Sequence, residues 1–183
     1  MPNHVANAID IKESVSKIRE ILNTVKGKTE EDKERLFSFE SIIPMPSDIS
    51  RGNLNYGDQK KSNGRNWYDW SIDNWRTKWN AYDVEIFHNI PPQSVEFIKE
   101  DFIVYLRIKF TTAWSTPDPI IKKFSEMFPD VLITHTCVEE DNQQFGIWEI
   151  LNGEEVSSKI NLESAKRKLK KLPKALEGVN PLT

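Results

Sequence analysis

The chain has 183 residues, of which 38% are hydrophobic and 29% are charged, and its formal net charge is -3. This length suits one domain with an extension, and the net charge gives no reason to expect nucleic acid or an anionic membrane as a partner. Because the single cysteine excludes an intramolecular disulfide, and because neither a secretory signal nor a membrane-length apolar run is present, we expect a cytoplasmic protein.

The first third of the chain contains a strand, a helix and a long loop. Alternating apolar residues predict a strand over residues 4–11. Ser14 then begins an amphipathic helix, which Gly27 ends. After an apolar patch at residues 37–43, Pro44-Met45-Pro46 fixes an extended turn. The polar residues 47–66 read as a long loop.

A tryptophan-rich run follows this loop. Four of the six tryptophans of the chain fall within thirteen residues, namely Trp67, Trp70, Trp75 and Trp79. The first half of the run predicts a short helix over residues 66–75 with Asn66 as its cap. The second half leads into a strand over residues 82–87. Such a density of aromatic rings must anchor a core or form a binding surface.

The second half of the chain has the clearest patterns. Residues 102–110 alternate as a half-buried strand, with Val104, Leu106 and Ile108 on one face and Tyr105 and Arg107 on the other. A helix over residues 116–128 has Thr116 as cap and Pro117 at its first position. Strands over residues 131–138 and 145–151 follow, and Asn152-Gly153 predicts a hairpin with a short return at residues 154–156.

This order of elements predicts an α+β fold of the ferredoxin-like type. Two split β-α-β units would form an antiparallel sheet with two helices on one face, and the other face would be open for binding. We expect this domain to span residues 1–156, with an insertion at 44–80 and an added hairpin. Residues 157–183 would then be a basic helix and tail.

Several motifs of the chain together resemble the Api-like, YubB-type proteins of phages, plasmids and bacteria. The motifs are Met1-Pro2-Asn3-His4, Ile43-Pro44-Met45-Pro46, Trp67-Tyr68-Asp69-Trp70, Asn74-Trp75, Thr77-Lys78-Trp79-Asn80-Ala81 and Thr112-Ala113-Trp114-Ser115. The resemblance implies a ferredoxin-like domain and a mobile-element context, and it supplies no catalytic residue. Relatives usually have glycine at the position of Arg76. A left-handed arginine there costs roughly 1 kcal/mol, so we expect a different turn.

The tryptophan-rich run is the leading candidate for a site. Rings near a flexible loop could form a stacking platform for a ligand, or they could pack the loop against the edge of the sheet. The side chains that we assign to a contact surface are Trp75, Arg76, Lys78, Trp79, Tyr82 and Trp114.

The other polar candidates favour a structural interpretation. The spacing of Asp69, Asp73, Asp83 and Glu85 matches no metal loop. His4, His88 and His135 fit no helical metal pair. His135 and Cys137 share one face of a strand as a possible ligand or nucleophile pair, although a buried cysteine is the commoner situation. We therefore expect no catalytic residue, cofactor or metal.

The charge of the chain reverses near its end. No lysine or arginine occurs from Glu139 to Glu155, whereas residues 159–174 contain seven. The basic segment could bind phosphate backbones, fold back on the acidic block, or dock through its apolar stripe, which includes Leu162, Ala165 and Leu169.

These observations favour a non-enzymatic binding module of a mobile genetic element. The module would contact a host protein or a nucleic acid through the tryptophan-rich insertion and the open sheet face. The alternative is an enzyme that acts on a nucleotide or nucleic acid with Asp83, His88 or His135 as polar groups. A further possibility is a homodimer formed through a sheet edge.

Overall fold

A computed structural model describes residues 3–29, 31–52, 66–91 and 99–183. Residues 53–65, which form most of the expected long loop, lie outside this part of the chain. The elements run in the order β1 (His4–Ser14), α1 (Val15–Val25), β2 (Gly27–Lys28), β3 (Glu34–Arg35), η1 (Phe39–Ser41), α3 (Trp67–Trp75), β4 (Tyr82–His88), β5 (Ile103–Ala113), α4 (Asp118–Met127), β6 (Ile133–Glu139), β7 (Phe145–Leu151), β8 (Glu154–Lys159), α5 (Leu162–Lys170) and η2 (Lys174–Leu176).

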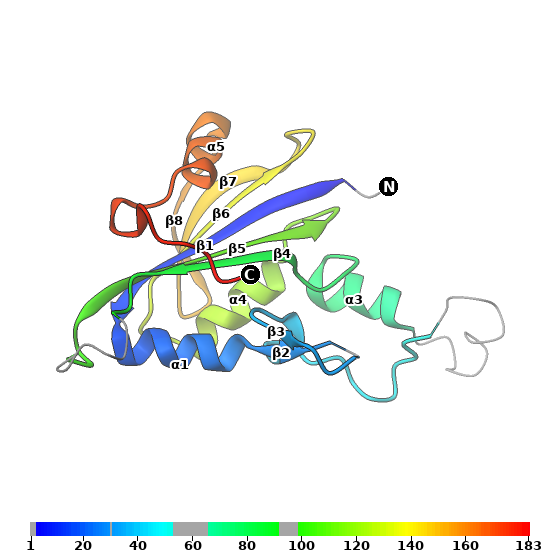
Figure 1. The fold of residues 1–183 in the computed structure, drawn as a ribbon. Helices are drawn as coiled ribbons and strands as arrows, with labels where there is room; N and C mark the ends of the chain where they lie inside the picture. The colour runs from blue at the N-terminus through cyan, green and yellow to red at the C-terminus, as the bar shows by residue number, and fades with distance from the viewer. Residues whose placement is uncertain (1–2, 30, 53–65, 92–98) are drawn as a thin grey trace.

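One six-stranded antiparallel sheet organises the chain (Figure 1). Its strand order is β4-β5-β1-β6-β7-β8. The four strands from β4 to β6, with α1 and α4 as the crossovers, are two split β-α-β units, which confirms the predicted ferredoxin-like fold. The hairpin of β7 and β8 extends the sheet beyond β6. Its return strand reaches Lys159, so the expected boundary at 156 falls inside β8.

The main hydrophobic core lies between the sheet and the helices α1 and α4. Alternate residues of β5 face it, as the sequence predicts, and Val104, Leu106 and Ile108 are fully or almost fully buried. Phe37 fills its centre, with ring centroids 5.0 Å from Phe110 and 5.8 Å from Phe39.

Two predicted helix starts have different outcomes. Ser14 caps α1 as expected, since its side chain accepts a hydrogen bond from the backbone amide of Lys17. Helix α4 begins one residue later than predicted, with Pro117 as its N-cap. The hydroxyl of Thr116 donates to the Asp118 carboxylate instead of capping the backbone.

The face of the sheet opposite α1 and α4 is not open, and this corrects the prediction from the sequence. Helix α5 packs on it against β1, β6 and β7 (Figure 1). Farther on, Leu182 pairs with Ile86 at the edge of β4 through two backbone hydrogen bonds. Segments from the end of the chain therefore cover part of the face that we expected to bind a partner.

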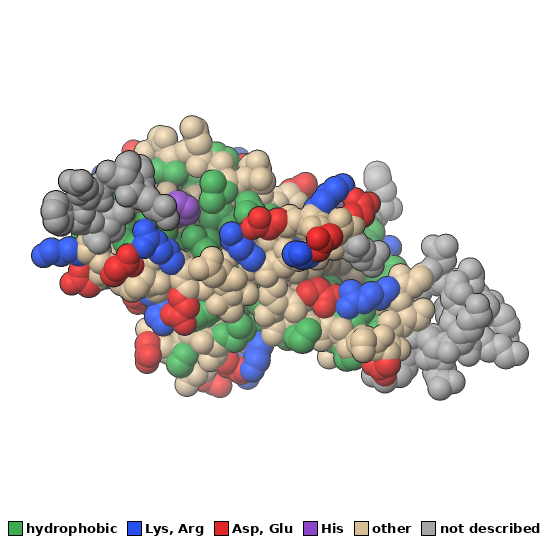
Figure 2. Space-filling view, turned by 60° about the horizontal axis from the view of Figure 1, so that its bottom comes forward, with side chains coloured by type: hydrophobic (Ala, Val, Ile, Leu, Met, Phe, Trp, Pro, Cys, Tyr) green, Lys and Arg blue, Asp and Glu red, His purple; other side chains and the backbone are tan. Residues whose placement is uncertain are grey.

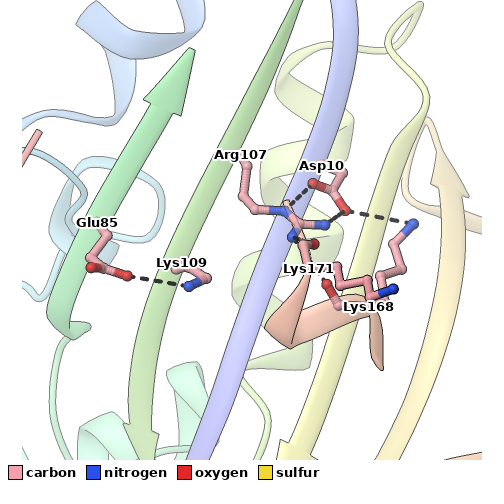
Figure 3. Close-up of polar contacts among 6 residues, drawn as sticks. All are labelled: Asp10, Glu85, Arg107, Lys109, Lys168 and Lys171. Carbon is pink, nitrogen blue, oxygen red and sulfur yellow. Dashed lines mark hydrogen bonds and ion pairs between the residues drawn. The ribbon is translucent and has the colours of Figure 1, made fainter. Parts of the chain in front are cut away.

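Arg107 is the residue that anchors α5 to this face (Figure 3). It belongs to the face expected to be half-exposed, yet its side chain is only 2% exposed. Its guanidinium donates to both carboxylate oxygens of Asp10, at 2.6 and 2.7 Å. It also donates to the carbonyls of Lys168 and Lys171, at 3.0 and 2.6 Å. These carbonyls lie at the C-terminal end of α5, where a cation complements the helix dipole.

Helix α5 contacts β7, which lies within the acidic block of residues 139–155, yet none of the salt bridges among the described residues joins its basic side chains to that block. An ion pair instead joins Lys168 to Asp10 of β1, at 3.5 Å. The apolar stripe contributes instead, because Ala165 is fully buried beneath the helix. Among the described residues, no helix is long and apolar enough to cross a membrane.

Figure 2 shows the face of the molecule that carries the helices of the main core. Acidic and basic side chains are interspersed across it. Exposed ion pairs on helices α1 and α4 include Lys17 with Glu20 and Lys123 with Glu126. The described residues of this face therefore offer no broad basic surface of the kind that holds a phosphate backbone.

Candidate functional site

Helix α3 positions the tryptophan-rich run at one end of the sheet. Asn66 caps it as predicted, because its side-chain oxygen accepts from the amide of Asp69 at 3.0 Å. The helix ends at Arg76, which has a left-handed backbone with φ 63° and donates its amide to Ile72. The expected change of turn is therefore wrong. Arginine adopts the conformation in which glycine is preferred, and its guanidinium pairs with Asp118 at 2.9 Å.

Trp75 is a core residue, which corrects its assignment to the contact surface. Its side chain is 3% exposed, and its indole nitrogen donates to the carbonyl of Ile43 at 2.9 Å. The rings of Phe39 and Trp70 meet it edge to face, at centroid distances of 5.8 and 5.3 Å. Burial and a satisfied indole nitrogen fix this ring in the fold, so it presents no face to a ligand.

Two tryptophans remain accessible. Trp79 and Trp114 are each 38% exposed, whereas Trp67, Trp70 and Trp148 are partly buried. Trp79 follows α3, and Trp114 follows β5, so segments far apart in sequence bring them together. Both were assigned to the contact surface from the sequence.

Lys78 connects these two rings. Its ammonium lies over Trp79 at 4.7 Å and over Trp114 at 5.2 Å from the ring centroids. It also lies over Tyr68 of α3 at 6.0 Å. Distances within about 6 Å over a ring face give a favourable cation–π interaction. We call Tyr68, Lys78, Trp79, Tyr82 and Trp114 the aromatic surface.

Tyr82 extends the aromatic surface toward the N-terminal strand. Its ring meets Trp79 edge to face at 6.2 Å, and its hydroxyl shares a 2.6 Å hydrogen bond with Nδ1 of His4. Burial, followed by the charges of Asp83 and Glu140, raises the pKa of Tyr82. The phenol therefore stays neutral at physiological pH.

Trp114 is held in a strained backbone conformation. Its φ is 75°, a region that bulky residues rarely adopt. Its amide donates to the carbonyl of Asn3 at 2.8 Å, and its carbonyl accepts from the side chain of Gln144 at 3.0 Å. Strain that the surroundings enforce is often found at functional positions.

The sequence missed two members of this region, Tyr68 and His4. The packing of Tyr68 against Trp114, at 6.0 Å between ring centroids, joins α3 to the end of β5. The contact of His4 with Tyr82 joins β1 to β4. The only signal in the sequence was the match of both residues to motifs of the Api-like resemblance. Local spacing cannot reveal contacts between such distant segments.

A hollow of about 850 Å³ begins beside Lys78 and Trp79 and extends past α3 to β2 and β3. Three of its basic side chains are neutralised by carboxylates, in the pairs Lys28–Asp32, Lys33–Glu31 and Arg51–Glu40. The hollow can therefore continue a contact surface without giving it a strong positive charge.

A second groove, of about 690 Å³, lies beside α4 and β7 and includes His135 and Cys137. His135 stacks on Trp148 and hydrogen-bonds Asn7 through Nε2 at 3.0 Å. Burial lowers the pKa of His135 to about 4 and raises the pKa of Cys137 to about 12. Because the thiol stays protonated at neutral pH, the two residues do not form an activated nucleophile pair.

The polar residues of the enzyme alternative do not converge. Asp83 and His88 lie near opposite ends of β4, and strands β5 and β1 separate this strand from His135 on β6. In the part of the chain that the structure describes, no group of three or more His, Cys, Asp or Glu side chains could hold a metal ion. Asp83, His88 and His135 therefore do not form one acid–base group.

The split β-α-β units, with helices α1 and α4 behind the sheet, place this protein among the ferredoxin-like α+β domains. Residues 94–177 match the family model described as the ferredoxin-like domain in Api92-like protein. This match supports the resemblance to Api-like proteins that the sequence motifs indicate.

A solved structure supports the same fold. The chain is similar to the crystal structure of a protein api92 from Yersinia pseudotuberculosis, with 17% sequence identity and a TM-score of 0.50. The likeness covers 71% of this chain and 42% of that chain, so this protein spans less than half of its structural relative. None of the curated proteins matches the sequence.

Proposed function

We propose that this protein is a non-enzymatic, cytoplasmic binding module of a mobile genetic element, and that its aromatic surface contacts a host protein. The observation that carries the proposal is the exposure of Trp79 and Trp114, each 38%, around the ammonium of Lys78. Tryptophan and tyrosine are enriched at the energetic centres of protein interfaces. The mobile-element context rests on the resemblance of the sequence motifs to Api-like proteins.

The surrounding charges favour a protein over a nucleic acid. Exposed carboxylates lie beside members of the aromatic surface, because Asp69 follows Tyr68 in the chain and the charges of Asp83 and Glu140 act on Tyr82. The net charge of the chain is -3. Arg76 is already paired with Asp118. A phosphate backbone would meet more negative than positive charge here.

The test is capture of partners from an extract of the host by the immobilised protein, followed by mass spectrometry. The double variant Trp79→Ala/Trp114→Ala should lose a partner that the wild type retains. Lys122→Met, a change of an exposed lysine on α4, should retain it. Equal capture by wild type and double variant would contradict the proposal.

A nucleic-acid partner is tested separately by titration with single-stranded oligothymidylate. Stacking of bases on Trp79 and Trp114 would quench their fluorescence, with a strong dependence on salt. We expect no saturable quenching at physiological ionic strength. Saturable quenching that the double variant abolishes would replace the host protein with a nucleic acid as the partner.

A further inference from the structure

The ammonium of Lys78 occupies a cage of three aromatic rings. Tyr68, Trp79 and Trp114 place their faces 6.0, 4.7 and 5.2 Å from it. Among the described residues no carboxylate forms an ion pair with this lysine, although acidic residues are abundant nearby. The partners of this ammonium are therefore the three rings. Rings arranged in this way recognise organic cations in general.

The cage is built by the fold and not by the lysine. Tyr68 lies on α3, and Trp114 lies after β5, where its left-handed backbone is tied to Asn3 and Gln144. Trp79 is supported from behind by Tyr82, at 6.2 Å between ring centroids. Because these supports do not involve Lys78, we expect the three rings to keep their positions when the lysine leaves.

The electrostatic surroundings also favour a cation. The charges of Asp83 and Glu140 act on Tyr82, whose ring touches Trp79. Asp69 lies one residue after Tyr68 on the exposed side of α3. The described residues pair none of these three carboxylates with a basic side chain.

We propose that Lys78 is an internal occupant of this cage, and that an arginine in a basic segment of the partner replaces it. This inference rests on the proposed protein-binding function and specifies the chemistry of the partner. A guanidinium is planar and more weakly hydrated than an ammonium, so it stacks better on tryptophan. The displaced Lys78 returns to water, where its charge is solvated. The unpaired carboxylates near the rings attract the remaining basic residues of the segment.

The probe is a short peptide with two arginines separated by glycines and with blocked ends, and tryptophan fluorescence reports its binding. The same peptide with lysines in place of the arginines should bind more weakly. Lys78→Met removes the competing cation and keeps most of the length of the side chain. We expect it to bind the arginine peptide about threefold more tightly. The energy of a partly exposed cation–π contact corresponds to about this factor in affinity.

The matched control is Lys122→Met, which changes the net charge equally but lies on α4, away from the cage. If both variants change the affinity equally, the effect is one of net charge and the cage proposal is overturned. Failure of the arginine peptide to bind either the wild type or Lys78→Met also overturns it. Loss of affinity in Trp114→Ala is required for support, with circular dichroism to verify that the variant is folded.

The two proposals fail in different ways. If the arginine peptide does not bind but the Trp79→Ala/Trp114→Ala variant still loses its host protein, the binding function stands and the cation cage does not. If no host protein depends on these rings, the binding function fails as well. Tighter binding of oligothymidylate than of the arginine peptide would contradict the cage and favour a nucleic acid.

Discussion

The anchor of α5 leads to a quantitative prediction about stability. Replacing Arg107 with methionine removes four hydrogen bonds, two to Asp10 and two to the carbonyls of Lys168 and Lys171. The carboxylate of Asp10, only 14% exposed, then keeps one ion-pair partner among the described residues, Lys168 at 3.5 Å. Removing one partner of a buried ion pair costs about 3–5 kcal/mol. Because Lys168 remains beside Asp10, we expect the loss of stability to lie near the lower end of this range.

A loss of about 3 kcal/mol lowers the melting temperature of a domain of this size by roughly 6–12 °C. Urea denaturation measures the free energy of unfolding directly. Trypsin should also cleave within α5 of Arg107→Met faster than in the wild type, because the helix loses its attachment. Both measurements use the full chain.

The control is Arg167→Met, which changes an exposed arginine on the same helix. A double variant, Asp10→Asn/Arg107→Met, should recover part of the lost stability, because it removes the charge of a buried carboxylate that has lost its guanidinium partner. If Arg107→Met is no less stable than Arg167→Met, the buried guanidinium does not hold α5 on the sheet and the reasoning is refuted.

Three further predictions concern single side chains. Trp75→Ala should lower the free energy of unfolding by about 3–5 kcal/mol because it empties a core position, whereas Trp79→Ala should cost less than about 1 kcal/mol; equal losses in urea denaturation would contradict this. The pKa of His135 is about 4 in the fold and about 6.5 in the unfolded chain. Between pH 4 and pH 6.5 the unfolded chain therefore binds more protons than the folded protein. Stability due to neutral His135 is therefore complete above pH 6.5 and declines toward pH 4, by about 2 kcal/mol from pH 7 to pH 5; His135→Gln should remove this component, and an unchanged pH profile would count against it. Arg76→Gly should be neutral or stabilising by up to about 1 kcal/mol, because glycine relieves the left-handed backbone; a clear fall in melting temperature would show that the exposed pair with Asp118 matters more.

The fold could be predicted because its signals are local. Alternation along β5, the cap at Ser14 and the cap at Asn66 each depend on residues only a few positions apart. The end of α3 illustrates the limit. An arginine at position 76 does not predict a left-handed residue, yet the helix ends in one. Packing on both sides outweighs the modest energetic cost of this backbone conformation.

The site could be predicted only in outline. Tryptophan density indicates that a surface or core is present, but it does not distinguish Trp75, which is buried, from Trp79, which is exposed. That difference depends on Phe39 and Ile43, which come from a segment more than thirty residues away. Likewise, the burial of Arg107 depends on α5, which follows some sixty residues later. Such contacts leave no periodic pattern in the sequence.

The two edge strands of the six-stranded sheet, β4 and β8, differ in how freely they can pair with a further strand. At β4 the backbone of Ile86 is engaged by Leu182, whereas β8 is the terminal strand on the other side and all its residues are exposed. A second molecule that joined there would use its own β8, since its other border is engaged in the same way. Such an assembly is two-fold symmetric and stops at two molecules. The position of Leu182 therefore opposes growth of the sheet into an open-ended fibre.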